Sequence, residues 1–153
     1  MAPVQHKIPE SVLVVIYTAS LEVLLLERAD HPGFWQSVTG SRAATDEPLV
    51  QTCVREVREE TGLATAPGDY VDWRHVNRYA IYAHWRHRYA PGVTHNTEHV
   101  FGLAVDAPFD VVLAAREHTR FQWCPWRQAA DLCFSWTNAQ AVRMLPDRVA
   151  RPA

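Results

Sequence analysis

Three glutamates, Glu56, Glu59 and Glu60, have the most distinctive spacing of any ionisable side chains in this sequence. Residues three and four positions apart are neighbours on a helix, so Glu56 would face both of the others. Carboxylates this close repel one another unless water solvates them or a cation lies between them. Ligand sets made of oxygen favour magnesium, calcium or manganese over zinc. The spacing therefore predicts either a solvated acidic helix face or a hard divalent metal site suited to phosphate chemistry.

The helix that would carry these glutamates is predicted from Asp46, as the N-cap, to about Thr61. Gly62 suits the position just after the helix, where the backbone often takes a left-handed conformation. Glu47 is expected to stabilise the start of the helix rather than to bind metal. Apolar residues at spacings of three and four would face the core, namely Leu49, Val50, Cys53, Val54 and Val57. The glutamates would then occupy the last turns, on a face away from much of this stripe.

The rest of the chain consists of strand-like and helix-like segments. β-Branched and aromatic runs predict strands or short extended segments at residues 12–17, 22–27, 34–39, 71–82, 84–89, 98–105 and 120–123. Helices are predicted at residues 126–132 and 138–145. This mixture predicts the α+β class, with a mixed β-sheet sandwiched between helices in three layers, α/β/α. We expect a loose lead-in at residues 1–10 and a single domain over residues 11–149.

Composition narrows the class of protein further. The chain has 153 residues, 48% of them hydrophobic and 21% charged, which is typical of one globular domain with a real core. The net charge of −2 gives no general attraction to nucleic acid, and no apolar run is long enough to cross a membrane. The three cysteines show no CxxC spacing and are expected to be reduced thiols in a cytoplasmic protein. A monomer and a homodimer both fit the sequence.

The segment from Arg55 to Leu63, REVREETGL, resembles the core of the Nudix box, whose pattern is G-x5-E-x7-R-E-U-x-E-E-x-G-U with U apolar. Every fixed position in the second half of the pattern matches, and Glu47 is the acid eight residues before Arg55. The glycine is Gly40, one residue earlier than the pattern asks. The loop from Ser41 to Asp46 therefore carries one extra residue, which a surface loop tolerates more easily than a helix.

The resemblance to the Nudix family implies an Mg²⁺-dependent enzyme that hydrolyses a phosphoanhydride bond, with Mn²⁺ able to replace Mg²⁺. The metal ligands that it implies are Glu56, Glu59, Glu60, the Gly40 carbonyl and Glu117, an acid outside the box. Glu56 and Glu60 are both candidates for the catalytic base, and the sequence does not choose between them. Arg55 would orient the carboxylates, because it reaches Glu59 at i+4. A plain surface acid is an equally good interpretation of Glu117.

Segments outside the box resemble one branch of the family, the dihydroneopterin triphosphate pyrophosphatases of bacterial folate synthesis. These segments are FWQSVTG at 34–40, RHRYAPGVT at 86–94, NTE at 96–98 and SWTN at 135–138. The resemblance implies a small-molecule triphosphate substrate, with dihydroneopterin triphosphate cleaved to dihydroneopterin monophosphate and pyrophosphate. The candidate substrate-binding residues are Trp35, Arg86, Arg88, Trp136 and Asn138.

Each of these candidates also has a plainer interpretation. Residues alternate across a strand, so Arg86 and Arg88 would share one face and could bind a polyphosphate, or they could simply protect an exposed strand edge. Trp35 and Trp136 could stack on a flat heterocycle or pack in the core. Core packing is the expectation for Trp73, Trp85, Trp123 and Trp126. Metal-ligand spacing is absent from the sequence around His31, His95, His99 and His118.

Two alternative functions stay open at the level of sequence. A pterin and a guanine present similar hydrogen-bonding edges, so the same chemistry on oxidised purine nucleoside triphosphates is the first. A Nudix-fold binding module without catalysis is the second. The intact acids at positions 56, 59 and 60 argue against this second alternative.

Overall fold

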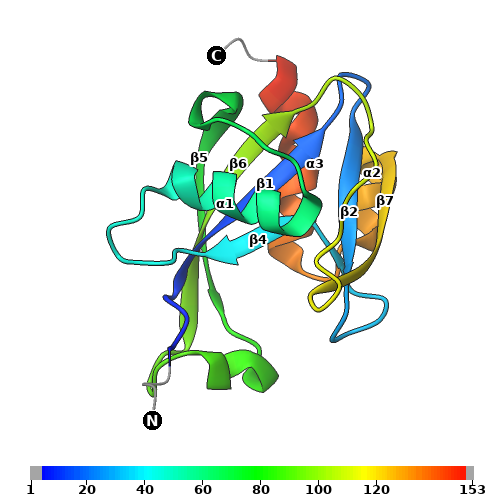
Figure 1. Cartoon of the computed structure of the whole chain (residues 1–153). Helices are drawn as coiled ribbons and strands as arrows, with labels where there is room; N and C mark the ends of the chain where they lie inside the picture. Colours follow the sequence, from blue (N-terminus) through cyan, green and yellow to red (C-terminus); the bar gives the residue numbers. More distant parts are fainter. Residues whose placement is uncertain (1–4, 151–153) are drawn as a thin grey trace.

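The computed structural model of the chain describes residues 5–150. Within them seven strands form one sheet, which is packed between helices (Figure 1). The elements in chain order are β1 (Glu10–Tyr17), β2 (Glu22–Arg28), β3 (Trp35–Gln36), β4 (Val38–Ser41), α1 (Leu49–Thr61), η1 (Pro67–Asp69), β5 (Tyr70–Ala80), η2 (Ala83–Arg88), β6 (His95–Ala104), β7 (His118–Pro125), α2 (Trp126–Leu132) and α3 (Trp136–Ala150). The strand order is β3-β2-β1-β6-β5, with β4 paired to β1 and β7 paired to β2.

The sheet is mixed, because β1 and β6 run parallel while the other paired strands are antiparallel. The parallel register joins Glu10 to Thr97 at one end and Tyr17 to Ala104 at the other. Helix α1 covers one face of the sheet, and α2 and α3 cover the opposite face (Figure 1). The predicted α+β class and its α/β/α sandwich are therefore confirmed.

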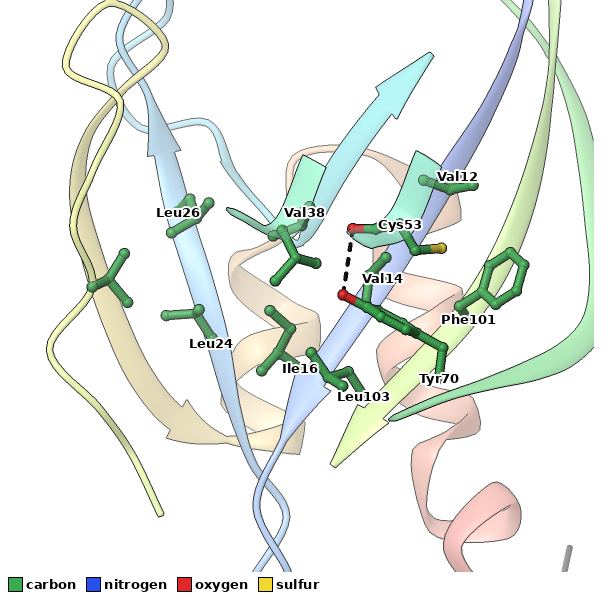
Figure 2. Close-up of a cluster of buried hydrophobic side chains, with 12 residues drawn as sticks. Val12, Val14, Ile16, Leu24, Leu26, Val38, Cys53, Tyr70, Phe101 and Leu103 are labelled. Carbon is green, nitrogen blue, oxygen red and sulfur yellow. Dashed lines mark hydrogen bonds between the residues drawn. The ribbon is translucent and has the colours of Figure 1, made fainter. Parts of the chain in front are cut away.

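The central strand β1 buries both of its faces, as its unbroken apolar run predicts. Val12, Val14 and Ile16 pack with Cys53 of α1 in the cluster that Figure 2 shows. The Tyr70 hydroxyl donates to the Cys53 carbonyl oxygen at 3.4 Å and so joins β5 to the same helix. The alternate residues of β1 pack against α2 and α3 on the other face. This double burial fixes α1, and with it the glutamates at the end of α1, on the sheet.

The start of α1 differs from the prediction. Asp46 is not the N-cap, because Pro48 occupies that position with φ −59° and ψ 139°. The residue before a proline disfavours the helical conformation, so Glu47 is excluded from the first turn. The predicted end is confirmed, since Gly62 takes a left-handed conformation with φ 79° and its N–H donates to the Arg58 carbonyl.

The strand predicted at His84–Tyr89 is wrong, because Ala83–Arg88 forms the short 3-10 helix η2. Its first turn closes through a hydrogen bond from the Trp85 N–H to the Tyr82 carbonyl at 2.9 Å. The aromatic residues that suggested a strand pack against one another instead of facing a partner strand. The rings of Tyr82 and Trp85, for example, meet edge to face with centroids 5.3 Å apart. Alternation across a strand therefore does not relate the two arginines of this segment.

Of the remaining predicted segments, the helix at 126–132 has its predicted ends and the others are present with shifted ends. Residues 34–39 divide between β3 and β4, and α3 continues through Pro146 to Ala150. The predicted lead-in at 1–10 lies partly outside the described residues, although Lys7 bridges to Tyr89 and β1 begins within it. All three cysteines are unpaired, as predicted. Of the helices in residues 5–150, none is long and apolar enough to span a membrane.

Candidate active site

The C-terminal turns of α1 place the three glutamates in different surroundings. Glu60 is 1% exposed, and among residues 5–150 neither of its carboxylate oxygens has a hydrogen-bond partner. Glu56 is mostly buried nearby, whereas the Glu59 side chain is 54% exposed. Burial, and then the charge of Glu56, raise the pKa of Glu60 well above the usual value for a glutamate. A buried carboxylate without donors is costly, so this position favours the binding of a cation.

Arg55 connects these glutamates to the loop before α1. Its guanidinium donates to the two Glu47 carboxylate oxygens at 3.2 and 3.0 Å, and to the Ser41 carbonyl at 2.9 Å. It also donates to Glu56 at 2.7 Å and lies 3.6 Å from Glu59, which is the contact expected at i+4. The same guanidinium holds the pKa of Glu47 at about 2. Glu47 therefore anchors Arg55, and Arg55 holds the acidic end of the helix against the loop.

Gly40 in β4 lies directly against Glu56. A Cβ atom at position 40 would overlap the carboxyl end of the Glu56 side chain. Gly40 pairs with Val12 of the central strand, so the sheet fixes its position. The extra residue in the loop at 41–46 therefore leaves Gly40 beside the glutamates, and glycine is needed there because of this close approach.

A second acid and a histidine approach Glu60 from the start of β7. Ligand atoms of Glu60, Glu117 and His118 all lie within 4.8 Å of one another. His118 is buried, and its Nε2 lies 3.7 Å from Oε1 of Glu60. Burial, and then the charge of Arg28, lower the pKa of His118 to about 4, so its ring is neutral at pH 7. Two carboxylates and a neutral imidazole, together with the orphaned oxygens of Glu60, form a donor set that fits a divalent cation.

Two cavities meet beside this donor set. The first, which we call the acidic cavity, has a volume of about 680 Å³. Its acidic wall consists of Glu56, Glu59, Glu60 and Glu117, with His118 beside them. The second, which we call the aromatic cavity, has a volume of about 290 Å³. Its aromatic wall consists of Tyr79, Tyr82, Trp85, Tyr89, Phe134 and Trp136.

Three basic side chains lie on the border between the cavities. Lys7, Arg28 and Arg88 line both the acidic and the aromatic cavity. Asp30 holds the two arginines, accepting from Arg28 at 2.9 Å and from Arg88 at 3.4 Å. The Arg28 guanidinium also lies 4.3 Å from the centre of the Trp85 ring. A chain of phosphates on this border would contact basic groups along its length, with acids at one end and aromatic rings at the other.

The candidate substrate-binding residues fall into two groups. Arg88, Trp136 and Asn138 line the aromatic cavity, and Trp136 is 57% exposed there. The Asn138 side chain is already engaged, because its Oδ1 accepts the Ser37 N–H at 2.9 Å. Asn138 therefore supports the cavity wall as well as lining it.

Trp35 and Arg86 line neither cavity. Trp35 packs on the core beneath α2 and α3, with the Arg120 guanidinium 5.3 Å from its ring centre. Arg86 donates from Nε to the Ile81 carbonyl at 3.3 Å. Their neighbours in sequence, Gln36 and Trp85, do line the aromatic cavity, but the side chains of Trp35 and Arg86 lie outside it.

Several residues of the site were not expected from the sequence. Trp85 was predicted to lie in the core and instead lines the aromatic cavity, whereas Trp73, Trp123 and Trp126 do pack on the core. His118 directly follows Glu117, and that adjacency could have drawn attention to it. Lys7 and Arg28 carry no sequence signal, because only the pairing of strands brings them to the border of the cavities.

These features agree with the comparisons with known proteins. The NUDIX domain pattern matches residues 7–145, and the chain belongs to the Nudix hydrolase family. It is 42% identical over 140 residues to dihydroneopterin triphosphate diphosphatase of Escherichia coli strain K12, covering 90% of this chain and 91% of that protein. A Haemophilus influenzae protein with the same name is 39% identical over 142 residues, covering 91% and 88%. The solved E. coli dihydroneopterin triphosphate pyrophosphohydrolase has a TM-score of 0.85 at 40% identity, covering 94% and 98%.

Proposed function

We propose that this chain is an Mg²⁺-dependent pyrophosphohydrolase that cleaves dihydroneopterin triphosphate to dihydroneopterin monophosphate and pyrophosphate. The observation that carries the proposal is the shared border of the two cavities. Lys7, Arg28 and Arg88 lie between a wall of acids and a wall of aromatic rings. A substrate with a flat ring and a polyphosphate chain matches this order of groups. The names of the relatives at 42% and 39% identity support the same substrate.

The residues that would hold Mg²⁺ are Glu56, Glu60, Glu117 and His118, with Glu59 and the Gly40 carbonyl as further predicted ligands at the edge of the cavity. Glu60 carries most of this assignment, because both of its oxygens are buried and lack donors among the described residues. Hard carboxylate oxygens suit Mg²⁺ or Mn²⁺. When bound, the cation would neutralise charge on the phosphates and polarise the attacking water.

The residues of the chain would position both reactants. Arg55 holds Glu56 at 2.7 Å and so limits the directions in which that carboxylate can point. Lys7, Arg28 and Arg88 would bind the phosphate oxygens and balance the negative charge that develops on the phosphates as the anhydride bond breaks. Either Glu56 or Glu60 would accept the proton from water as it attacks, and both lie on the acidic wall.

The substrate assignment is tested by comparing kcat/KM for dihydroneopterin triphosphate with kcat/KM for dGTP and for its oxidised form, 8-oxo-dGTP. We expect dihydroneopterin triphosphate to be preferred by at least tenfold, which is about 1.4 kcal/mol of transition-state discrimination. A tenfold preference for either nucleotide would replace the pterin assignment with the nucleotide one. A rate no faster than that of the Glu60→Gln variant, for all three compounds, would favour a binding module without catalysis.

This substrate would place the reaction in folate biosynthesis, and the unpaired thiols fit a cytoplasmic enzyme. Whether the chain acts as a monomer or a homodimer stays a prediction that solution mass measurements can decide.

A further inference from the structure

Two buried polar side chains in the aromatic cavity have hydrogen-bonding atoms that the protein does not use. Asn96 and Glu98 lie two positions apart on β6, so their side chains share one face of the sheet. Each is 2% exposed, and both line the aromatic cavity. Among residues 5–150, neither Oδ1 of Asn96 nor Oε1 of Glu98 has a hydrogen-bond partner. An unpaired buried acceptor destabilises the protein, and more so when it is charged, so a ligand that satisfies these atoms would gain affinity.

The unused atoms are all acceptors. The Asn96 amide nitrogen is already committed, because it donates to the Ser11 hydroxyl at 2.8 Å and to the Tyr79 hydroxyl at 3.0 Å. The acceptors that remain without a partner among residues 5–150 are therefore Oδ1 of Asn96 and Oε1 of Glu98. Burial raises the pKa of Glu98 to about 7, so a ligand that donates N–H groups would also favour the ionised carboxylate.

We infer that Glu98, with Asn96 beside it, recognises the 2-amino-4-oxo edge of the substrate ring inside the aromatic cavity. That edge carries a ring N–H next to an amino N–H₂, and these two adjacent donors match the two unpaired acceptors, Oε1 of Glu98 and Oδ1 of Asn96. The rings of Tyr82, Trp85 and Phe134 in the cavity wall would pack on the faces of the heterocycle while Glu98 reads its edge. The inference rests on the proposed function, because it places the ring of the triphosphate in this cavity.

The choice of ring follows from the same chemistry. Pterin and guanine both present the adjacent donor pair, so both are acceptable to Glu98. Hypoxanthine keeps the ring N–H but lacks the amino group, and would leave one acceptor unsatisfied. Adenine and cytosine present an acceptor nitrogen where the ring N–H should be. A site built to hydrogen-bond a group rejects analogues that lack it more strongly than an apolar pocket can.

The test measures equilibrium binding in EDTA, where hydrolysis is suppressed. GTP and ITP serve as matched probes, because they share the sugar and triphosphate and differ only in the amino group. We expect the unmodified protein to bind GTP at least tenfold more tightly than ITP. ITP lacks the amino group and therefore one hydrogen bond to the charged carboxylate, and a loss of this kind typically weakens binding by about this factor. In Glu98→Gln, which keeps the shape of the side chain, GTP and ITP should bind with equal affinity. Glu22→Gln, at the start of β2 and outside both cavities, is the control and should keep the difference.

Dihydroneopterin triphosphate itself provides the second probe, with binding at least about tenfold weaker in Glu98→Gln than in the unmodified protein. Equal affinity of the unmodified protein for GTP and ITP, or unchanged binding of dihydroneopterin triphosphate in Glu98→Gln, would overturn the inference. If Glu98→Gln does not fold, the comparison of GTP with ITP on the unmodified protein decides alone. The proposed function is judged separately by kcat/KM of the unmodified protein. Efficient cleavage of dihydroneopterin triphosphate without discrimination between GTP and ITP would remove the role of Glu98 and keep the function.

Discussion

Replacing Gly40 with alanine should separate catalysis from stability. The added Cβ would overlap the carboxyl end of Glu56, so that side chain must move. To reach an ordinary carbon contact of about 3.5–4.0 Å, the Glu56 carboxyl has to retreat by more than about 1 Å. The atoms that must move form the end of a flexible side chain, and the φ angle of Gly40 is not in the left-handed region. The backbone of β4 can therefore stay where it is.

The two consequences of this displacement differ in size. Overpacking costs about 1–3 kcal/mol, and the flexibility of Glu56 places the cost near the lower limit, at about 1 kcal/mol. A misplacement of about 1 Å in a catalytic group costs about 100-fold in rate. The contact of Arg55 with Glu56 at 2.7 Å would be disrupted as well, so the displaced carboxylate would lose the guanidinium that orients it. We therefore expect kcat to fall about 100-fold while the fold is kept.

The assay is steady-state hydrolysis of dihydroneopterin triphosphate with saturating Mg²⁺, paired with urea unfolding of the same preparations. Gly68→Ala is the matched control, because a Cβ at Gly68 meets nothing within 4 Å. It should match the unmodified protein in kcat. A Gly40→Ala protein with a kcat within twofold of the control would refute the contact between Gly40 and Glu56 as a functional constraint. A loss of stability well above 3 kcal/mol would refute the view that only Glu56 moves.

Glu60→Gln should raise the melting temperature of the metal-free protein, because it removes a buried carboxyl group that lacks donors and is costly to ionise, and it should lower kcat at least 100-fold. A metal-free variant less stable than the unmodified protein would contradict this. Glu47, whose pKa falls from 4.5 to about 2 through its bonds with Arg55, should contribute stability above pH 4.5 and lose it as the pH falls toward 2. The difference in unfolding free energy between the unmodified protein and Glu47→Gln should therefore shrink over that range, and a constant difference would argue against the ion pair. Arg88→Ala should raise KM about tenfold, because one contact with the phosphates is lost. Arg143→Ala on α3 is the control and should leave KM unchanged. Equal KM values for the two variants would exclude Arg88 from substrate binding.

The part of the site on α1 was predictable because the sequence features that define this helix are local. The stripe from Leu49 to Val57 shows the periodicity of a helix, and Gly62 marks its end, so the positions of the glutamates on α1 follow from the sequence. The start was misplaced because Pro48 restricts Glu47, and the side chain of Glu47 is used by Arg55 rather than by the helix. The burial of Glu60 could not be read from the helix alone, because it depends on the register that brings His118 of β7 above it.

The substrate side was less predictable because its residues come from distant segments. Arg28 lies on β2, Glu98 on β6 and Phe134 between α2 and α3, and only the tertiary fold brings them to one cavity. Nothing in their immediate sequence distinguishes the roles of Trp35 and Trp85, but Trp35 packs on the core and Trp85 lines the cavity. The aromatic content of residues 84–89, which suggested a strand, reflects instead a cluster of rings around the cavity.

We propose that acids from α1 and from the segment just before β7 hold a divalent cation that is required for cleavage of the triphosphate. The most direct measurement follows dihydroneopterin triphosphate by mass spectrometry during incubation with the protein, in Mg²⁺, in excess EDTA, and after Mg²⁺ is restored. We predict equimolar dihydroneopterin monophosphate and pyrophosphate with Mg²⁺, no cleavage in EDTA and full recovery when Mg²⁺ returns. Cleavage that continues after complete removal of metal, or release of orthophosphate in place of pyrophosphate, would contradict the account.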